Sequence, residues 1–234
     1  MPRRIKPRAI GAGATLGIAA PGGPLDPETL HAGCEVWRAA GFRVVHRDDI
    51  VARSSYLAGD DARRVAELEE LWSDPRAHTM ASTRILDRLD ARAVRAARKP
   101  LVGYSDVTAL LLWQRRRAGL VGFHGPMLER GSDVEPAALR ALIAALTGAT
   151  RDEDRLWKGT ARIAGRCTGR LVGGNLTLVA ASLGTPWEVD TRGAILLVED
   201  VHEPPYRIDR LLQQLRAAGK LARLVGLGTG AFTG

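Results

Sequence analysis

Apolar and polar residues follow one another along this chain in two patterns, one typical of strands and the other of helices. Apolar or alternating runs predict strands at 15–20, 42–45 and 100–104. Helical spacing follows at 26–40, 60–72, 84–89, 91–97 and 106–117; Asp26 and Pro27 open the first helix and Gly41 ends it. This alternation predicts an α/β fold with an open, mostly parallel, Rossmann-like sheet, which binds ligands at the carboxyl ends of its strands.

A polar stretch at 148–158 interrupts this pattern and is typical of a linker. Beyond it we expect strands at 168–172 and 194–198 and helices at 175–182 and 206–218. The chain therefore divides near residue 155 into an N-terminal α/β domain, 1–155, and a smaller α/β domain, 156–234.

The turn Gly-Tyr-Ser-Asp-Val-Thr at 103–108 is the strongest candidate for chemistry, because it places Ser105 between a predicted strand and a predicted helix. Unpaired N–H groups and the positive end of the helix dipole at such a turn favour negative charge, including a tetrahedral oxyanion. The alternative is that Ser105 is simply the N-cap of the helix, since serine is among the commonest N-cap residues.

A second candidate is the pair Glu199 and Asp200, which follows the apolar run at 195–198. A buried carboxylate needs a partner, so either residue could cap the turn and pair with Arg207 or Arg210. In the functional alternative, one of them orients the histidine of a Ser-His-Glu triad.

The composition excludes several classes of protein. The net charge of +8 over 234 residues would permit an anionic partner, but arginines such as Arg92, Arg95 and Arg98 are scattered over helical faces and indicate a solvated surface. Three Phe and three Tyr leave little for stacking on nucleic-acid bases. Cys34 and Cys167 suggest neither a disulfide framework nor a zinc site, as expected of a reduced intracellular protein. We therefore expect no nucleic-acid partner and no zinc site.

The basic N-terminus followed by an apolar run at 9–20 superficially resembles a secretory signal. Glycines interrupt that run, and cleavage near Ala20 would remove the first predicted strand. We therefore expect no signal, no membrane partner and a cytoplasmic location.

Five collinear motifs resemble those of the LD-carboxypeptidase family of serine peptidases, which includes the microcin-immunity peptidases. They are Gly-Tyr-Ser-Asp-Val-Thr-Ala-Leu-Leu at 103–111, Phe-His-Gly-Pro-Met at 123–127, Gly-Arg-Leu-Val-Gly-Gly-Asn-Leu-Thr-Leu at 169–178, Gly-Thr-Pro-Trp at 184–187 and Leu-Val-Glu-Asp-Val-His-Glu-Pro-Pro-Tyr-Arg-Ile-Asp-Arg at 197–210. The resemblance implies that Ser105 is the nucleophile, that Glu199 is the triad acid and that the backbone N–H of Asp106 is an oxyanion donor. Asn175 would border the substrate cleft.

The chain departs from the family in two places. The family's Arg-Gly-Gly-Tyr-Gly loop, which contributes to the oxyanion hole, is replaced by Met-Ala-Ser-Thr at 80–83. The family's triad histidine, downstream of the acid, has no counterpart in this sequence. His124 belongs to the His-Gly-Pro-Met motif and His202 lies on a turn, and neither is assigned as the base.

The resemblance thus implies a serine carboxypeptidase that releases the terminal D-Ala of a murein tetrapeptide, or cleaves a peptide-conjugate substrate, in peptidoglycan recycling. It implies neither a metal nor an organic cofactor. The alternative is a catalytically incompetent remnant that binds a peptide or a partner protein without hydrolysis. Because the second domain looks truncated, we also expect reduced stability or association into a homodimer.

Overall fold

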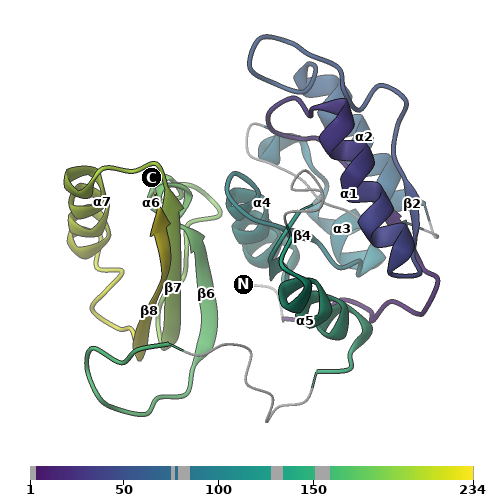
Figure 1. Ribbon diagram of the computed structural model, residues 1–234. Helices are drawn as coiled ribbons and strands as arrows, with labels where there is room; N and C mark the ends of the chain where they lie inside the picture. The colour runs from purple at the N-terminus through teal and green to yellow at the C-terminus, as the bar shows by residue number, and fades with distance from the viewer. Residues whose placement is uncertain (1–3, 75–76, 79–84, 128–133, 151–158, 234) are drawn as a thin grey trace. The chain divides into compact units, whose positions relative to one another are not determined.

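A computed structural model describes residues 4–74, 77–78, 85–127, 134–150 and 159–233 of the chain (Figure 1). The chain forms two compact units, Met1–Asp154 and Arg155–Gly234. Each unit is α/β with parallel strands, which confirms the predicted fold class.

The described strands of the first unit form two small parallel sheets. In one sheet, β1 (Thr15–Gly17) lies between β2 (Arg43–Val45) and β3 (Ala77–His78). The other pairs β4 (Val102–Gly103) with β5 (Phe123–His124). Neither β3 nor β5 was predicted, because each has two residues and, unlike β4, neither was recognised as part of a longer apolar run.

Most helices in the described part of the first unit lie close to where the pattern predicts them, but the last one, Pro136–Thr147, was not predicted. They are α1 (Pro27–Ala39), α2 (Asp61–Ser73), a 3₁₀ turn (Leu86–Arg88), α3 (Ala91–Ala97), α4 (Val107–Trp113), a π-helical segment (Gln114–Ala118) and α5 (Pro136–Thr147). The Asp26 carboxylate accepts a hydrogen bond from the Thr29 N–H at 2.9 Å, so the predicted cap of α1 is confirmed. The predicted helix at 106–117 is correct in place but not uniform in type, since its last turn widens into the π form.

One apolar core joins the two sheets of the first unit. Leu16 and Ile18, from β1 and the residues after it, share this core with Val102 of β4 and with Trp37 of α1. The rings of Trp37 and Phe42 meet edge to face with centroids 5.6 Å apart. The carboxyl ends of β1 and β4 are therefore held by the same packed layer.

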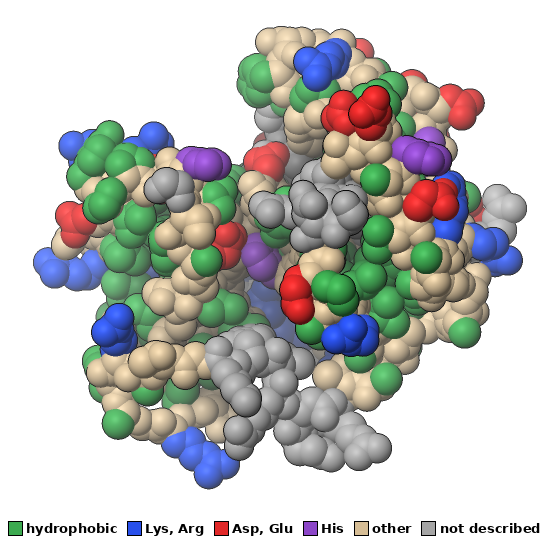
Figure 2. All heavy atoms as spheres, in the orientation of Figure 1, with side chains coloured by type: hydrophobic (Ala, Val, Ile, Leu, Met, Phe, Trp, Pro, Cys, Tyr) green, Lys and Arg blue, Asp and Glu red, His purple; other side chains and the backbone are tan. Residues whose placement is uncertain are grey.

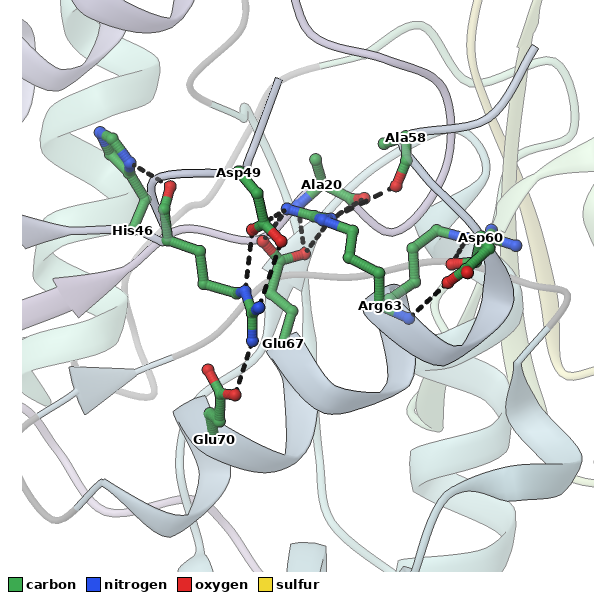
Figure 3. A network of polar contacts seen from close by, with 10 residues as sticks. Ala20, His46, Asp49, Ala58, Asp60, Arg63, Glu67 and Glu70 are labelled. Atoms are coloured by element: carbon green, nitrogen blue, oxygen red, sulfur yellow. Dashed lines mark hydrogen bonds and ion pairs between the residues drawn. The ribbon is translucent and has the colours of Figure 1, made fainter. Parts of the chain in front are cut away.

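A buried ion pair on α2 anchors the chain that follows β1 (Figure 3). The Glu67 side chain is fully buried and accepts hydrogen bonds from the Ala20 N–H at 2.9 Å and from both terminal nitrogens of Arg63, at 2.8 and 3.1 Å. Arg63 also donates to the carbonyls of Ala20 and Ala58, at 3.4 and 3.3 Å. Burial is the main influence on Glu67 and raises the pKa of its carboxyl above the usual value, while Arg63 opposes that shift.

The second unit is a parallel sheet in which β7 (Ala194–Val201) lies between β6 (Arg170–Asn175) and β8 (Gly226–Thr233), with helices α6 (Leu176–Ala181) and α7 (Pro205–Ala217). Alternate residues of β7 are buried, and the intervening ones are half-buried except Val201, which is exposed. β7 extends three residues beyond the predicted strand, so Glu199 and Asp200 lie within it and not after it.

The strands β6 and β7 approach each other closely at Gly173. A Cβ atom at this position would lie 1.8 Å from the Leu197 carbonyl oxygen, and the φ of Gly173 is +134°. Only glycine fits there, which explains one glycine of the Gly-Gly-Asn motif.

Large apolar side chains are exposed on the second unit, and Figure 2 shows hydrophobic side chains at the surface of the part that holds α7 and β8. They include Leu171 at 49%, Tyr206 at 58% and Leu227 at 55% exposure. Among the helices of the described residues, none is long and apolar enough to cross a bilayer. The expected homodimer and the expected cytoplasmic location stay predictions.

Replacing Glu67 with Ala is expected to destabilise the first unit by about 3 kcal/mol, because the Ala20 N–H loses its acceptor and Arg63 keeps only the more exposed carboxylate of Asp49, at 3.3 Å. The measurement is the free energy of opening from amide hydrogen exchange of the β1 and α2 residues. Glu70→Ala is the matched control: Glu70 pairs with Arg47 at an exposed site and should cost about 1 kcal/mol or less. Equal losses in the two variants would contradict the anchoring role of Glu67.

Replacing Asp200 with Ala is expected to destabilise the second unit by about 2–4 kcal/mol, because buried donors on α6 lose their acceptor. Hydrogen exchange of the β6 and β7 amides measures the effect. Asp190→Ala, which removes a partly exposed pair with Arg170, is expected to cost about 1 kcal/mol or less. An Asp200 variant as stable as the Asp190 variant would refute the assignment.

Candidate active site

The turn after β4 holds Ser105 in a backbone conformation that is rare for serine. The φ of Ser105 is +51°, in the left-handed region, where a residue with a Cβ atom is strained by about 1–2 kcal/mol. The turn is closed by hydrogen bonds from the Val107 N–H to the Tyr104 carbonyl, at 3.0 Å, and from the Thr108 N–H to the Ser105 carbonyl, at 2.9 Å. Asp106, not Ser105, is the N-cap residue of α4, so the interpretation of Ser105 as a simple N-cap is wrong.

At position 103, just before the turn, there is space only for glycine. A Cβ atom at Gly103 would lie 2.5 Å from a methyl carbon of Val107, on the first turn of α4. Gly103 therefore allows the helix to start directly over the end of β4, which makes the strand-to-helix turn sharp. In the sequence, this glycine stands out only as one member of a motif.

The helix that carries the turn is rigidly held. Every residue of α4 is buried, and its last residue, Trp113, stacks on Trp72 of α2 with ring centroids 6.5 Å apart. A candidate nucleophile at the start of such a helix has little freedom to shift.

One candidate histidine lies beside this turn in the first unit. His124 on β5 is in register with Gly103 on β4, and the Gly125 N–H donates to the Gly103 carbonyl at 3.2 Å. The motif at 123–127 is thus brought next to the strand that leads into Ser105. The other candidate, His202, belongs to the second unit, where it has a φ of +59° and its N–H donates to the Thr233 carbonyl at 2.6 Å.

The two carboxylates of β7 have different surroundings, because successive side chains on a strand point to opposite faces. Asp200 is 4% exposed, and its carboxylate accepts hydrogen bonds from the Asn175 Nδ2, at 2.7 Å, and from the Thr177 N–H and hydroxyl, at 3.0 and 2.8 Å. It therefore ties β7 to the start of α6. Glu199 is half-buried on the opposite face.

Neighbouring strands limit the space around Glu199. Glu199 is in register with Asn175 on β6, and a Cβ atom at Gly230 on β8 would lie 3.0 Å from the Glu199 Cβ. The backbone of β8 thus runs close beside this side chain. Nothing in the sequence singles out Gly230, because its importance depends on the register of β8 against β7.

Asn175 is the N-cap of α6 as well as a partner of Asp200. Its Oδ1 accepts from the Leu178 N–H at 3.1 Å while its Nδ2 donates to Asp200. These contacts give Asn175 a structural role at the carboxyl end of β6. Its predicted position at the border of a substrate cleft stays a prediction.

One alternative pairs Glu199 or Asp200 with Arg207 or Arg210, and for Asp200 the structure shows other partners. Arg207 forms an ion pair with Glu203 at 2.8 Å, and the Arg210 guanidinium lies 5.0 Å from the centre of the Tyr206 ring. Asp200 is satisfied by Asn175 and Thr177 instead, because both belong to the turn that directly faces it. The hydroxyl of Thr177 is a partner that the sequence pattern did not predict.

No group of three or more His, Cys, Asp and Glu side chains that could hold a metal ion occurs in the described part of the chain. The candidate chemistry rests on Ser105, Asp106 and Glu199. The first two belong to the first unit and Glu199 to the second. The Met-Ala-Ser-Thr segment at 80–83 lies outside the described residues.

Comparison with known protein families finds a match for each unit, and both matches are to domains of the same family. Residues 16–125 match the model of the LD-carboxypeptidase N-terminal domain, and residues 168–234 match that of the C-terminal domain.

Individual relatives agree with this assignment. A probable murein peptide carboxypeptidase of Bacillus subtilis is 37% identical over 95% of this chain and 73% of its own. The murein tetrapeptide carboxypeptidase of Pseudomonas aeruginosa is 31% identical over 79% of this chain and 65% of its own.

The fold agrees as well. The crystal structure of a muramoyltetrapeptide carboxypeptidase from Oxalobacter formigenes is similar with a TM-score of 0.80 and 29% identity, over 94% of this chain and 77% of that one. Matched in both units, this chain belongs to the LD-carboxypeptidase family of hydrolases.

Proposed function

We propose that this protein hydrolyses the amide between an L-residue and a terminal D-residue in a murein-derived peptide, with release of D-Ala. The observation that carries the proposal is the left-handed backbone at Ser105, on a sharp turn between a strand and a fully buried helix. Strain of this kind persists only where the surrounding structure enforces it, and it is concentrated at functional sites. The names of the relatives supply the substrate class.

In the proposed mechanism, the Ser105 Oγ attacks the carbonyl carbon of the scissile amide and passes its proton to a general base. The resulting oxyanion accepts a hydrogen bond from the Asp106 N–H, at the start of α4. Collapse of this intermediate breaks the C–N bond, the amine of D-Ala leaves with a proton, and water then hydrolyses the acyl-enzyme.

Glu199 is proposed as the acid that orients the base. The separation of roles along β7 supports this choice, because Asp200 is committed to the start of α6 while Glu199 lies on the opposite face. The family's base is a histidine, and no residue of this sequence is assigned to that role. Loss of a triad base lowers turnover by about 10⁶-fold, so the level of activity depends on where the base comes from.

The first test of the proposal is release of D-Ala from a murein tetrapeptide by the purified chain, followed by mass spectrometry over long incubations at high enzyme concentration. We expect release that Ser105→Ala abolishes, and covalent labelling of Ser105 by a serine-directed phosphonate. Ser182→Ala is a control, since Ser182 donates to a backbone carbonyl in α6 and should affect neither readout. Peptide binding without release or labelling would support the alternative of a non-hydrolysing binding protein.

The second test concerns the strain at Ser105. Because glycine adopts a positive φ without penalty, Ser105→Gly should be more stable than Ser105→Ala by about 1 kcal/mol. Thermal unfolding of the two variants measures the difference. At Ala96, inside α3, the order should reverse, with Gly about 1 kcal/mol less stable than Ala. If Ser105→Gly proved no more stable than Ser105→Ala, the turn would not be strained.

A further inference from the structure

Three basic stretches that lie far apart in the sequence meet on one surface of the first unit. They come from the N-terminal segment, from α3 and its C-cap, and from the π-helical segment after α4. The residues that define this basic surface are Arg4, Lys6, Arg8, Arg92, Arg95, Arg98, Arg116 and Arg117. Along the chain alone, these residues look scattered.

Backbone hydrogen bonds join the N-terminal segment to both other stretches. The Ile5 N–H donates to the Gly119 carbonyl at 2.9 Å, and the Val121 N–H donates to the Ile5 carbonyl at 3.1 Å. The Arg8 N–H donates to the Arg98 carbonyl at 2.8 Å. Residues 4–8 therefore lie in the seam between the end of α3 and the end of the π-helical segment.

Side chains point outward from this seam in a regular way. Along residues 4–8, the three basic side chains are exposed while Ile5 and Pro7 are half-buried, as expected of an extended segment with one face outward. Arg92, Arg98 and Arg117 are also exposed. At least six cationic groups thus reach solvent on this surface.

Acidic residues are missing from the stretches that build the basic surface. The sequence has no Asp or Glu at 1–25, at 91–105 or at 107–127. Asp90 caps the far end of α3, and Asp106 lies at the opposite end of the helix from Arg116, about 15 Å away by helical rise. The positive potential of the surface is therefore not offset by acids within its own segments.

Part of this charge has a structural explanation. Arg95 donates to the Ala118 carbonyl at 2.8 Å and Arg98 to the Lys6 carbonyl at 3.2 Å, and cations at helix C-termini complement the helix dipole. Those roles do not explain the exposed side chains of Lys6, Arg8 and Arg117. A row of exposed like charges destabilises a folded protein slightly, so a ligand that neutralises them would bind favourably.

The composition of the surface indicates the ligand. Seven of the eight cations are arginines, and the planar guanidinium of arginine can donate two parallel hydrogen bonds to a phosphate. The large exposed apolar side chains of the described residues all lie elsewhere, so the surface offers neither a wedge for a lipid bilayer nor a platform for unstacked bases. Binding to an array of phosphates requires neither exposed apolar side chains nor exposed aromatic rings.

We propose that the basic surface binds the phosphodiester backbone of a nucleic-acid duplex without regard to base sequence. A duplex presents about one phosphate charge per 1.7 Å of its axis, so several arginines of one surface can engage it together. This interaction is independent of the proposed peptidase activity, and none of the residues that define the surface belongs to the candidate active site.

The test measures binding of a labelled 20-base-pair DNA duplex of arbitrary sequence to the full chain by fluorescence anisotropy, between 50 and 200 mM salt. The logarithm of the dissociation constant should rise steeply with the logarithm of the salt concentration. In the variant Lys6→Gln, Arg8→Gln, Arg117→Gln, affinity at low salt should fall at least about tenfold, and the salt slope should decrease by about three.

The matched control is the variant Arg53→Gln, Arg140→Gln, Arg216→Gln, which neutralises three exposed arginines outside the basic surface. Both variants lower the net charge from +8 to +5 (8 − 3 = 5), and the control should change affinity less than twofold. Equal losses in the two variants would overturn the proposal, because net charge alone would then explain binding. Tight binding to anionic vesicles without duplex binding, or duplex binding insensitive to salt, would overturn it as well.

Discussion

The buried ion pair between Arg63 and Glu67 is the interaction on which the first unit depends most. The strands of this unit are two or three residues long, so their ladders satisfy few backbone groups. Backbone N–H and C=O groups just past such strands still need partners if they are buried. The pair on α2 supplies these partners. Glu67 accepts a hydrogen bond from the Ala20 N–H, and Arg63 donates to the carbonyls of Ala20 and Ala58.

In the second unit, the single carboxylate of Asp200 satisfies polar groups at the end of a strand. Asp200 accepts hydrogen bonds from the start of α6 and so fixes the carboxyl end of β7 against its neighbour β6. Because side chains alternate across a strand, fixing Asp200 on one face also fixes Glu199 on the other. Two adjacent acids thus acquire separate roles, one as an anchor and one as a candidate for chemistry. At Ser105, too, neighbouring structure fixes the position of a candidate residue. The strained turn is held between Gly103, at the end of β4, and the buried helix α4.

Much of the secondary structure was predictable from local pattern. The cap of α1 at Asp26, the extent of α2 and the place of α7 follow from residues that interact within one or two turns. The strands β3 and β5 were not predicted: each has only two residues, and each pairs with a strand that is distant in the sequence. The sequence also could not show that Asp106, and not Ser105, directly precedes α4, because both are good capping residues and the left-handed backbone of Ser105 is set by the turn.

The sequence by itself determined the family, the α/β alternation of most strands and helices, and the candidate residues Ser105 and Glu199, because these depend on residue type and spacing along the chain. Only the tertiary structure decided which charged side chains are buried and which lie together on one surface. Glu67 is one acid among several on a charged helix until folding places it against Ala20 and Arg63. The basic residues of the N-terminal segment, α3 and the π-helical segment look scattered until backbone hydrogen bonds bring the three stretches together. The physical reason is that burial and electrostatic potential depend on distance in space, which local sequence does not encode.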